Sequence, residues 1–181
     1  MRRAWPIAKH LYTEIHVLMF NHSFIFNSGN WTGEGKITLN MVEEELFFNT
    51  NWFVLTKDFA GKVACAQEIQ IHGLSENMRN ELTFYDFNNK GFTVDMENQN
   101  VGKIVGAGVY DDKMIAWEFR GNDMQFEGFE TYSLQSDGSY TMKGEYVTSD
   151  QFRTQIEARI WPGAPKAEEE NKEDSSEEGT P

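Results

Sequence analysis

The sequence is poor in the residues that most often carry covalent and metal chemistry. It has a single cysteine, Cys65, and four histidines in 181 residues. One cysteine can form neither an internal disulfide nor a cysteine-rich zinc site, which fits a reducing compartment and predicts a cytoplasmic protein. Because Cys65 lies in an apolar run, we expect a buried, unreactive thiol. His10, His16 and His22 are six residues apart, a spacing that does not align on one helical face, so we expect no metal site.

Positive charge and long apolar runs are also scarce. The 16 Lys and Arg face 29 Asp and Glu, a formal net charge of -13, which argues against binding to nucleic acid or to an anionic membrane surface. No apolar run is long enough to cross a membrane, and charged residues and histidines interrupt the start of the chain. These features predict a soluble, unexported protein without a signal peptide.

No nucleophile motif is present, since the sequence has no G-x-S-x-G and no serine beside a histidine in its β-rich part. We therefore predict no cofactor and no assigned catalytic residue. Four glutamates on predicted strands stay open as general acids or bases if they point inward, whereas facing water would make them ordinary surface groups. They are Glu68, Glu118, Glu127 and Glu130.

The two ends of the chain differ from its middle. Residues 1–28 form a lead-in segment, in which helical spacing of apolar residues predicts a short helix between Ile7 and Phe20 that could cap a barrel. Residues 162–181 begin with Pro162, Gly163 and Pro165 and continue as an acidic stretch without aromatic or branched aliphatic residues. This composition predicts a disordered tail.

The middle of the chain alternates between apolar and polar residues, and Asp-, Asn- and Gly-rich turns interrupt it every ten to fifteen positions. Short turns make strands adjacent in sequence adjacent in space, and closure removes exposed edges. We therefore predict an all-β fold, a single closed or nearly closed antiparallel up-and-down barrel of about ten strands over residues 29–161. The predicted strands are 31–38, 45–56, 62–72, 79–86, 91–97, 102–110, 113–120, 124–135, 139–148 and 152–160.

A family resemblance supports this fold. Gly29, Asn30 and Trp31 have the G-x-W form that opens the first strand of lipocalins and fatty-acid-binding proteins, the calycin group, in which the tryptophan plugs one end of the barrel. The run WTGEGKI resembles the start of nitrobindin-like proteins, and ELTFYDFNNKGFTVD and VGAGVYDDKMIAWEF resemble their middle hairpins. The likeness spans roughly Gly29 to Trp161. It implies a ligand inside the barrel.

The resemblance has two departures. Nitrobindin-like proteins hold haem through a late histidine, but no histidine follows His72, so haem is not expected. Fatty-acid-binding proteins place R-x-Y on the inner face of the last strand, where this chain has Arg159 and Trp161 as R-x-W. Alternation leaves two readings, because either the apolar face with Ile156 and Ile160 points inward or the face with Arg159 does.

The leading hypothesis is a barrel that binds a small, partly apolar ligand through aromatic side chains contributed by different strands. A barrel of about ten strands is wider than side chains easily fill, which favours a cavity. The alternatives are an enzyme that uses an inward carboxylate, and a protein-interaction module with a filled barrel. The expected ligand-binding residues are Trp52, Phe84, Trp117, Tyr132, Tyr146 and Arg159.

Overall fold

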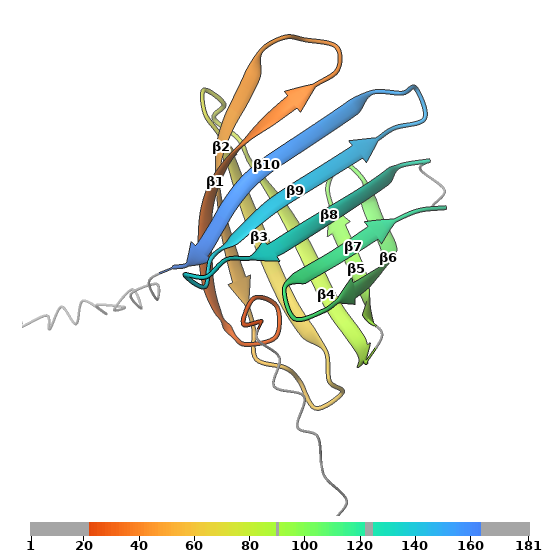
Figure 1. Cartoon of the computed structure of the whole chain (residues 1–181). Coiled ribbons are helices and arrows are strands. Elements are labelled where there is room, and N and C mark those ends of the chain that lie inside the picture. The colour runs from red at the N-terminus through yellow and green to blue at the C-terminus, as the bar shows by residue number, and fades with distance from the viewer. Residues whose placement is uncertain (1–21, 90, 122–124, 164–181) are drawn as a thin grey trace, which may run out of the picture.

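The structure, a computed structural model, describes residues 22–89, 91–121 and 125–163, and this part of the chain forms strands and no helix. Ten strands follow one another in an up-and-down meander (Figure 1). They are β1 (Gly29–Leu39), β2 (Glu45–Val54), β3 (Val63–Ile71), β4 (Asn77–Asn88), β5 (Gly91–Asn98), β6 (Gly102–Tyr110), β7 (Met114–Phe119), β8 (Glu127–Leu134), β9 (Tyr140–Val147) and β10 (Arg153–Pro162).

The sheet closes on itself because β1 pairs with both β2 and β10, and every neighbouring pair is antiparallel. This confirms the prediction of a closed antiparallel barrel of about ten strands. The predicted helix between Ile7 and Phe20 lies outside the described residues, as does the tail from residue 164 onward. None of the described residues belongs to a helix long and apolar enough to span a membrane.

Closure depends on two glycines of β1. A Cβ atom at Gly33 would lie 2.4 Å from the Arg159 carbonyl oxygen, and one at Gly35 would lie 2.4 Å from the Glu157 carbonyl oxygen. Real Cβ atoms do not approach backbone oxygens this closely, so only glycine lets β1 run so near β10. This agrees with the expectation that Gly33 and Gly35 allow a bent first strand to pass close to its neighbours.

The period-two pattern of the sequence sets which side chains fill the barrel. On β7, Ile115, Trp117 and Phe119 are buried inside, and the residues between them are less buried. On β10 the apolar face points inward, with Ile160 only 1% exposed. Arg159 lies on the outer face of the same strand.

One end of the barrel is filled by an aromatic core. Residues 22–28, which precede β1, turn across this end and place Phe24 inside, where it is fully buried (Figure 1). The Phe24 ring lies 5.4 Å from Trp31, 5.1 Å from Trp52 and 4.9 Å from Tyr132, measured between ring centroids. Edge-on and tilted packing of this kind stabilises aromatic clusters. We call this half of the barrel the closed end.

A histidine fastens the lead-in segment to the closed end. His22 is 2% exposed, and its Nε2 lies 2.7 Å from the Asp111 carbonyl oxygen, to which it donates a hydrogen bond. With Nε2 protonated, Nδ1 of the neutral ring accepts a hydrogen bond from the Tyr140 hydroxyl at 3.0 Å. Both ring nitrogens are therefore used in holding the segment against the barrel.

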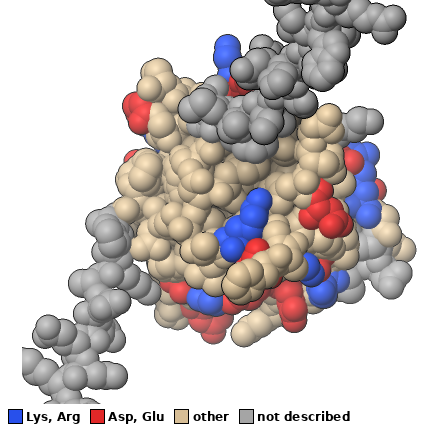
Figure 2. All heavy atoms as spheres, turned by 90° about the horizontal axis from the view of Figure 1, so that it is seen from below, with Lys and Arg blue, Asp and Glu red and all other residues tan. Residues whose placement is uncertain are grey.

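The outer surface of the closed end carries charges of both signs. Seen from this side, Lys and Arg lie interspersed with Asp and Glu among many uncharged residues, and neither sign covers the face (Figure 2). On the described part of this face, Lys and Arg do not gather into one continuous patch.

Trp31 should be essential for stability because it is 4% exposed and packs against Phe24 and Tyr140. We expect Trp31→Ala to lower the free energy of unfolding by about 3 to 5 kcal/mol, the usual cost of truncating a large buried aromatic residue. Urea denaturation measures this change. Phe59→Ala, at a fully exposed loop position, is the control and should change stability by less than about 0.5 kcal/mol. Equal effects for both variants would contradict the role of Trp31.

Candidate functional site

A cavity of about 460 Å³ occupies the half of the barrel opposite the closed end. It lies toward the loops that follow β1, β3, β5, β7 and β9, and we call this side the open end. The floor of the cavity is formed by the residues that it shares with the core, which are Trp52, Met96, Tyr132, Met142 and Ile160. The apolar part of the wall is Ile37, Phe48, Trp52, Ile69, Met78, Met96, Val101, Phe126, Met142, Phe152, Ile156, Ala158 and Ile160.

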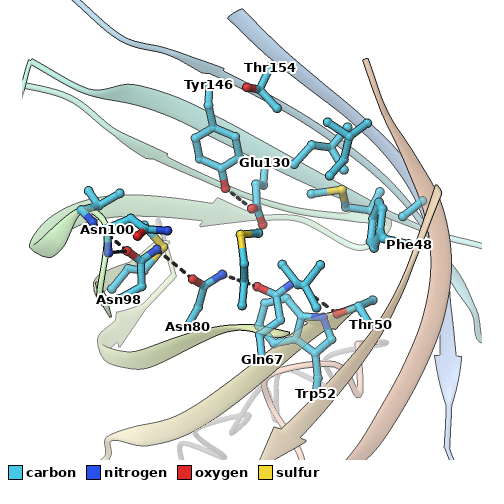
Figure 3. A pocket seen from close by; sticks show the side chains of 18 of the residues that line it. Phe48, Thr50, Trp52, Gln67, Asn80, Asn98, Asn100, Glu130, Tyr146 and Thr154 are labelled. Atoms are coloured by element: carbon cyan, nitrogen blue, oxygen red, sulfur yellow. Dashed lines mark hydrogen bonds between the residues drawn. The ribbon is translucent and has the colours of Figure 1, made fainter. Parts of the chain in front are cut away.

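A row of three amide side chains and one threonine hydroxyl crosses four neighbouring strands on one side of the cavity (Figure 3). Asn98 of β5 donates to Asn80 of β4 at 2.9 Å, and Asn80 donates to Gln67 of β3 at 2.8 Å. Gln67 donates in turn to the Thr50 hydroxyl of β2 at 3.4 Å, and that hydroxyl donates to the Glu68 carbonyl oxygen at 3.0 Å. We call Thr50, Gln67, Asn80 and Asn98 the amide row.

The far end of the amide row is also held in place. The Asn98 side-chain oxygen accepts hydrogen bonds from the backbone N–H groups of Asn100 at 2.9 Å and Val101 at 2.7 Å, in the turn between β5 and β6. Each NH₂ group of the row uses one N–H within it, and a carboxamide oxygen has two lone pairs. A fixed strip of hydrogen-bonding groups therefore lines an otherwise largely apolar wall.

A carboxyl group and two phenols form a second polar cluster in the cavity wall. Glu130 of β8 is 7% exposed, and its carboxylate accepts a hydrogen bond from the Tyr132 hydroxyl at 2.7 Å. Its other oxygen accepts one from the Tyr146 hydroxyl of β9. Figure 3 shows Glu130 and Tyr146 reaching toward each other inside the cavity. All three side chains line the cavity, and we call them the Glu130 cluster.

Two glycines lie opposite this cluster on the paired strands, and one of them makes room for it. Gly128 pairs with Tyr146 across β8 and β9, and a Cβ atom there would lie 2.2 Å from the Tyr146 ring. Gly144 pairs with Glu130, and a Cβ atom there would lie 3.5 Å from Glu130 Cγ and 3.0 Å from Met142 Cε. The glycine beneath the Tyr146 ring thus lets the phenol lie flat on β8 and reach the carboxylate.

Burial changes the acidity of all three groups in the cluster. It raises the pKa of Glu130 above the usual value of 4.5, and the hydrogen bonds from Tyr146 and Tyr132 oppose this rise. Burial also raises the pKa of each phenol well above 10.0, and the nearby Glu130 charge raises both further. The phenols therefore remain protonated donors at neutral pH.

No Lys, Arg or His is found among the described residues that line the cavity. The basic residues that form ion pairs lie on the outer surface, where Lys36 contacts Glu45 and Arg79 contacts Glu68. The Glu130 carboxylate is thus stabilised by neutral donors alone. In the described part of the chain, no group of three His, Cys, Asp or Glu could hold a metal ion.

The structure brings together three of the six residues expected to bind a ligand. Trp52, Tyr132 and Tyr146 line the cavity. Phe84 and Trp117 are buried in the aromatic core, where their rings are 5.4 Å apart, and they do not line the cavity. Arg159 lies outside, where its guanidinium donates to Asp137 and, at 3.2 Å, to the Ser139 hydroxyl.

The four candidate glutamates also divide between the cavity and the outer surface. Glu130 alone among them lines the cavity, while Glu118 and Glu127 are exposed on the outer face. Glu68 pairs with Arg79 at the surface. Cys65 is 2% exposed, and burial raises the pKa of its thiol to about 12, in agreement with the expectation of an unreactive thiol.

Sequence reasoning missed the amide row. Its signal was present, because Thr50 lies between Phe48 and Trp52 on the inward face of β2, and Gln67 lies between Cys65 and Ile69 on that of β3. A polar residue at an inward position of an alternating strand points to a buried hydrogen-bond network or a ligand.

No family model matches the chain, and no curated protein matches its sequence. Among solved structures, an S-type phycobiliprotein lyase from Guillardia theta is similar, with a TM-score of 0.58 and 9% identity over 77% of this chain and 90% of that one. An AttH-type protein from Nitrosomonas europaea has a TM-score of 0.29 and 8% identity over 77% of this chain and 52% of that one. At this identity the likeness to the lyase extends only to the fold, an antiparallel β-barrel.

The raised pKa of Glu130 predicts a pH-dependent stability. A carboxyl whose pKa is higher in the folded than in the unfolded state favours folding at low pH, and this contribution is lost as pH rises through the folded pKa. We therefore expect Glu130→Gln to gain stability relative to the unmodified protein as the pH rises above 4.5, the usual pKa of this carboxyl. Urea denaturation over this range, with exposed Glu127→Gln as control, measures the difference. A difference that stays constant with pH would show that Glu130 titrates like a surface carboxyl.

Proposed function

We propose that this protein binds a small, partly apolar molecule inside the open half of the barrel. The observation that carries the proposal is a cavity of about 460 Å³ whose mainly apolar wall holds two fixed polar features, the amide row and the Glu130 cluster. Ligand sites commonly have this composition, in which apolar surface supplies affinity and a few placed polar groups set orientation.

The arrangement of the interior favours this function over an interaction module. The module hypothesis requires a barrel filled with side chains, whereas here the aromatic core fills the closed end and leaves the open half hollow. Inward polar groups are costly in a protein that has no use for them, since each must be desolvated. A ligand would supply partners for their remaining donors and acceptors.

The solved structures add one consideration. The Guillardia theta protein with a similar barrel is named as a phycobiliprotein lyase. A bilin is therefore one small molecule to consider for this chain. The proposal itself rests on the cavity, because at 9% identity that likeness extends only to the fold.

Catalysis is the second candidate function, and Glu130 is the observation that favours it. A buried carboxyl with a raised pKa, held by two hydrogen-bond donors inside a cavity, has the properties of a general acid or base. Of the three groups in the cluster, Glu130 would exchange a proton with a bound substrate, while Tyr132 and Tyr146 would position it.

A neutral fluorescent probe tests the binding proposal. N-phenyl-1-naphthylamine should bind the folded protein saturably with one site per chain, because a concave apolar cavity buries most of a small ligand. Thr154→Trp places a large side chain in the cavity and should weaken binding about tenfold or more, and fluorescence titration measures this.

The matched control for this test is Gln155→Trp, which adds the same side chain at the next residue of β10 on the outer, exposed face. It should bind the probe as the unmodified protein does. Probe uptake that never saturates, or that is equally affected by both substitutions, would contradict a ligand site inside the barrel.

A further inference from the structure

We infer that the ligand is a planar organic cation bearing an N–H group, and that Glu130 is the residue that holds it. This inference rests on the proposed function, because it concerns the same cavity. It assigns a charge and a shape to the molecule, neither of which the barrel fold specifies.

The hydrogen-bonding capacity of Glu130 favours a ligand that donates an N–H group. A carboxylate has about four lone-pair sites and donates nothing. Tyr132 and Tyr146 each occupy one site, on different oxygens. The carboxylate is therefore oriented by two donors and keeps capacity for a donor from within the cavity. A ligand N–H group fits this capacity, whereas the ionised carboxylate would repel a ligand carbonyl or carboxylate oxygen.

The charge of Glu130 also favours a cationic ligand. An ionised carboxylate in a largely apolar cavity is costly unless an opposite charge lies near it. The described lining residues provide no Lys, Arg or His, so none of them places a positive charge beside Glu130, and a bound cation would supply one. The same lack of a basic residue disfavours an anionic ligand such as a fatty acid, since Arg159 lies outside the barrel and is paired with Asp137.

The aromatic side chains in the cavity wall favour a flat ligand. Aromatic side chains contribute to the wall from several sides, among them Phe48, Trp52, Phe126 and Phe152. Aromatic faces bind flat conjugated cations through stacking and cation–π attraction. The amide row supplies hydrogen bonds along one side of the cavity, so a flat molecule can use an edge for the row and its faces for the rings (Figure 3).

Three acridines of one ring system test the inference. At neutral pH, 9-aminoacridine is a cation with N–H groups, acridine is mostly uncharged, and acridine-9-carboxylate is an anion. We expect 9-aminoacridine to bind the unmodified protein about tenfold or more tighter than acridine, as a charge-assisted hydrogen bond predicts, and the carboxylate to bind most weakly. Fluorescence titration and calorimetry measure the three affinities.

Two substitutions test whether Glu130 causes the preference for the cationic dye. Glu130→Gln keeps the size of the side chain and should reduce the preference for 9-aminoacridine over acridine to less than about threefold. Glu127→Gln removes a charge from the outer face of the same strand and should keep the full preference. A preference that persists in Glu130→Gln would overturn the assignment of Glu130.

The pH dependence of the unmodified protein gives a test without substitutions. Because a bound cation favours the ionised carboxyl, affinity for 9-aminoacridine should rise with pH through the Glu130 titration, with release of a proton on binding. The titratable groups that face Glu130 are the Tyr132 and Tyr146 phenols, and the Cys65 thiol lies close to Tyr132. The pKa of each of these groups lies well above neutral, so none of them would produce this change.

The outcomes separate the inference from the proposed function. If acridine binds and Thr154→Trp blocks it but the three dyes bind alike, the cavity binds ligands and the inferred charge preference is wrong. Tighter binding of acridine-9-carboxylate than of 9-aminoacridine would overturn the inference in the same way. If no acridine binds but N-phenyl-1-naphthylamine does, the inference alone is contradicted. If neither the acridines nor N-phenyl-1-naphthylamine bind saturably, the proposed function is contradicted as well.

Discussion

The pairing of β1 with β10 is the constraint on which the rest of the structure depends. It closes ten strands into a ring, and it requires the close approach that Gly33 and Gly35 allow. Barrel width grows with the number of strands, and ten strands enclose more space than inward side chains of ordinary size fill. The interior must therefore be filled by something else or left hollow. In this chain the closed end is filled by the aromatic core, and the open half holds the cavity.

Part of the filling of the closed end comes from a segment outside the sheet. Residues 22–28 insert Phe24 among Trp31, Trp52 and Tyr132, and His22 fastens the segment to Tyr140 and the backbone of Asp111. This aromatic core buries much apolar surface in one half of the molecule. The open half can then carry inward polar groups, whose burial opposes folding, without loss of the fold. Stability and the candidate site thus occupy different ends of one barrel.

The sequence allowed the strands and their closure to be predicted, because alternation and turn residues are local signals. It also favoured a cavity, through the strand count. It did not separate Trp52 from Trp117, since both are inward aromatic residues and only the position along the barrel axis distinguishes cavity wall from core. The Glu130 cluster depends on register: Gly128 lies opposite Tyr146 only once β8 and β9 are aligned. Alternation specifies a face but not a cross-strand partner.

Neither protonation state of Glu130 is fully favourable with its two phenol partners alone. When ionised, it accepts from both phenols but bears a buried charge with no cation among the described lining residues. When Glu130 is protonated, it loses its charge, but one of its oxygens becomes a donor and accepts less well. One phenol must then accept a hydrogen bond instead of donating one, or make a weaker hydrogen bond. Neither state satisfies both electrostatics and hydrogen bonding. A cation with an N–H group satisfies both, because it neutralises the charge while the two phenols keep donating.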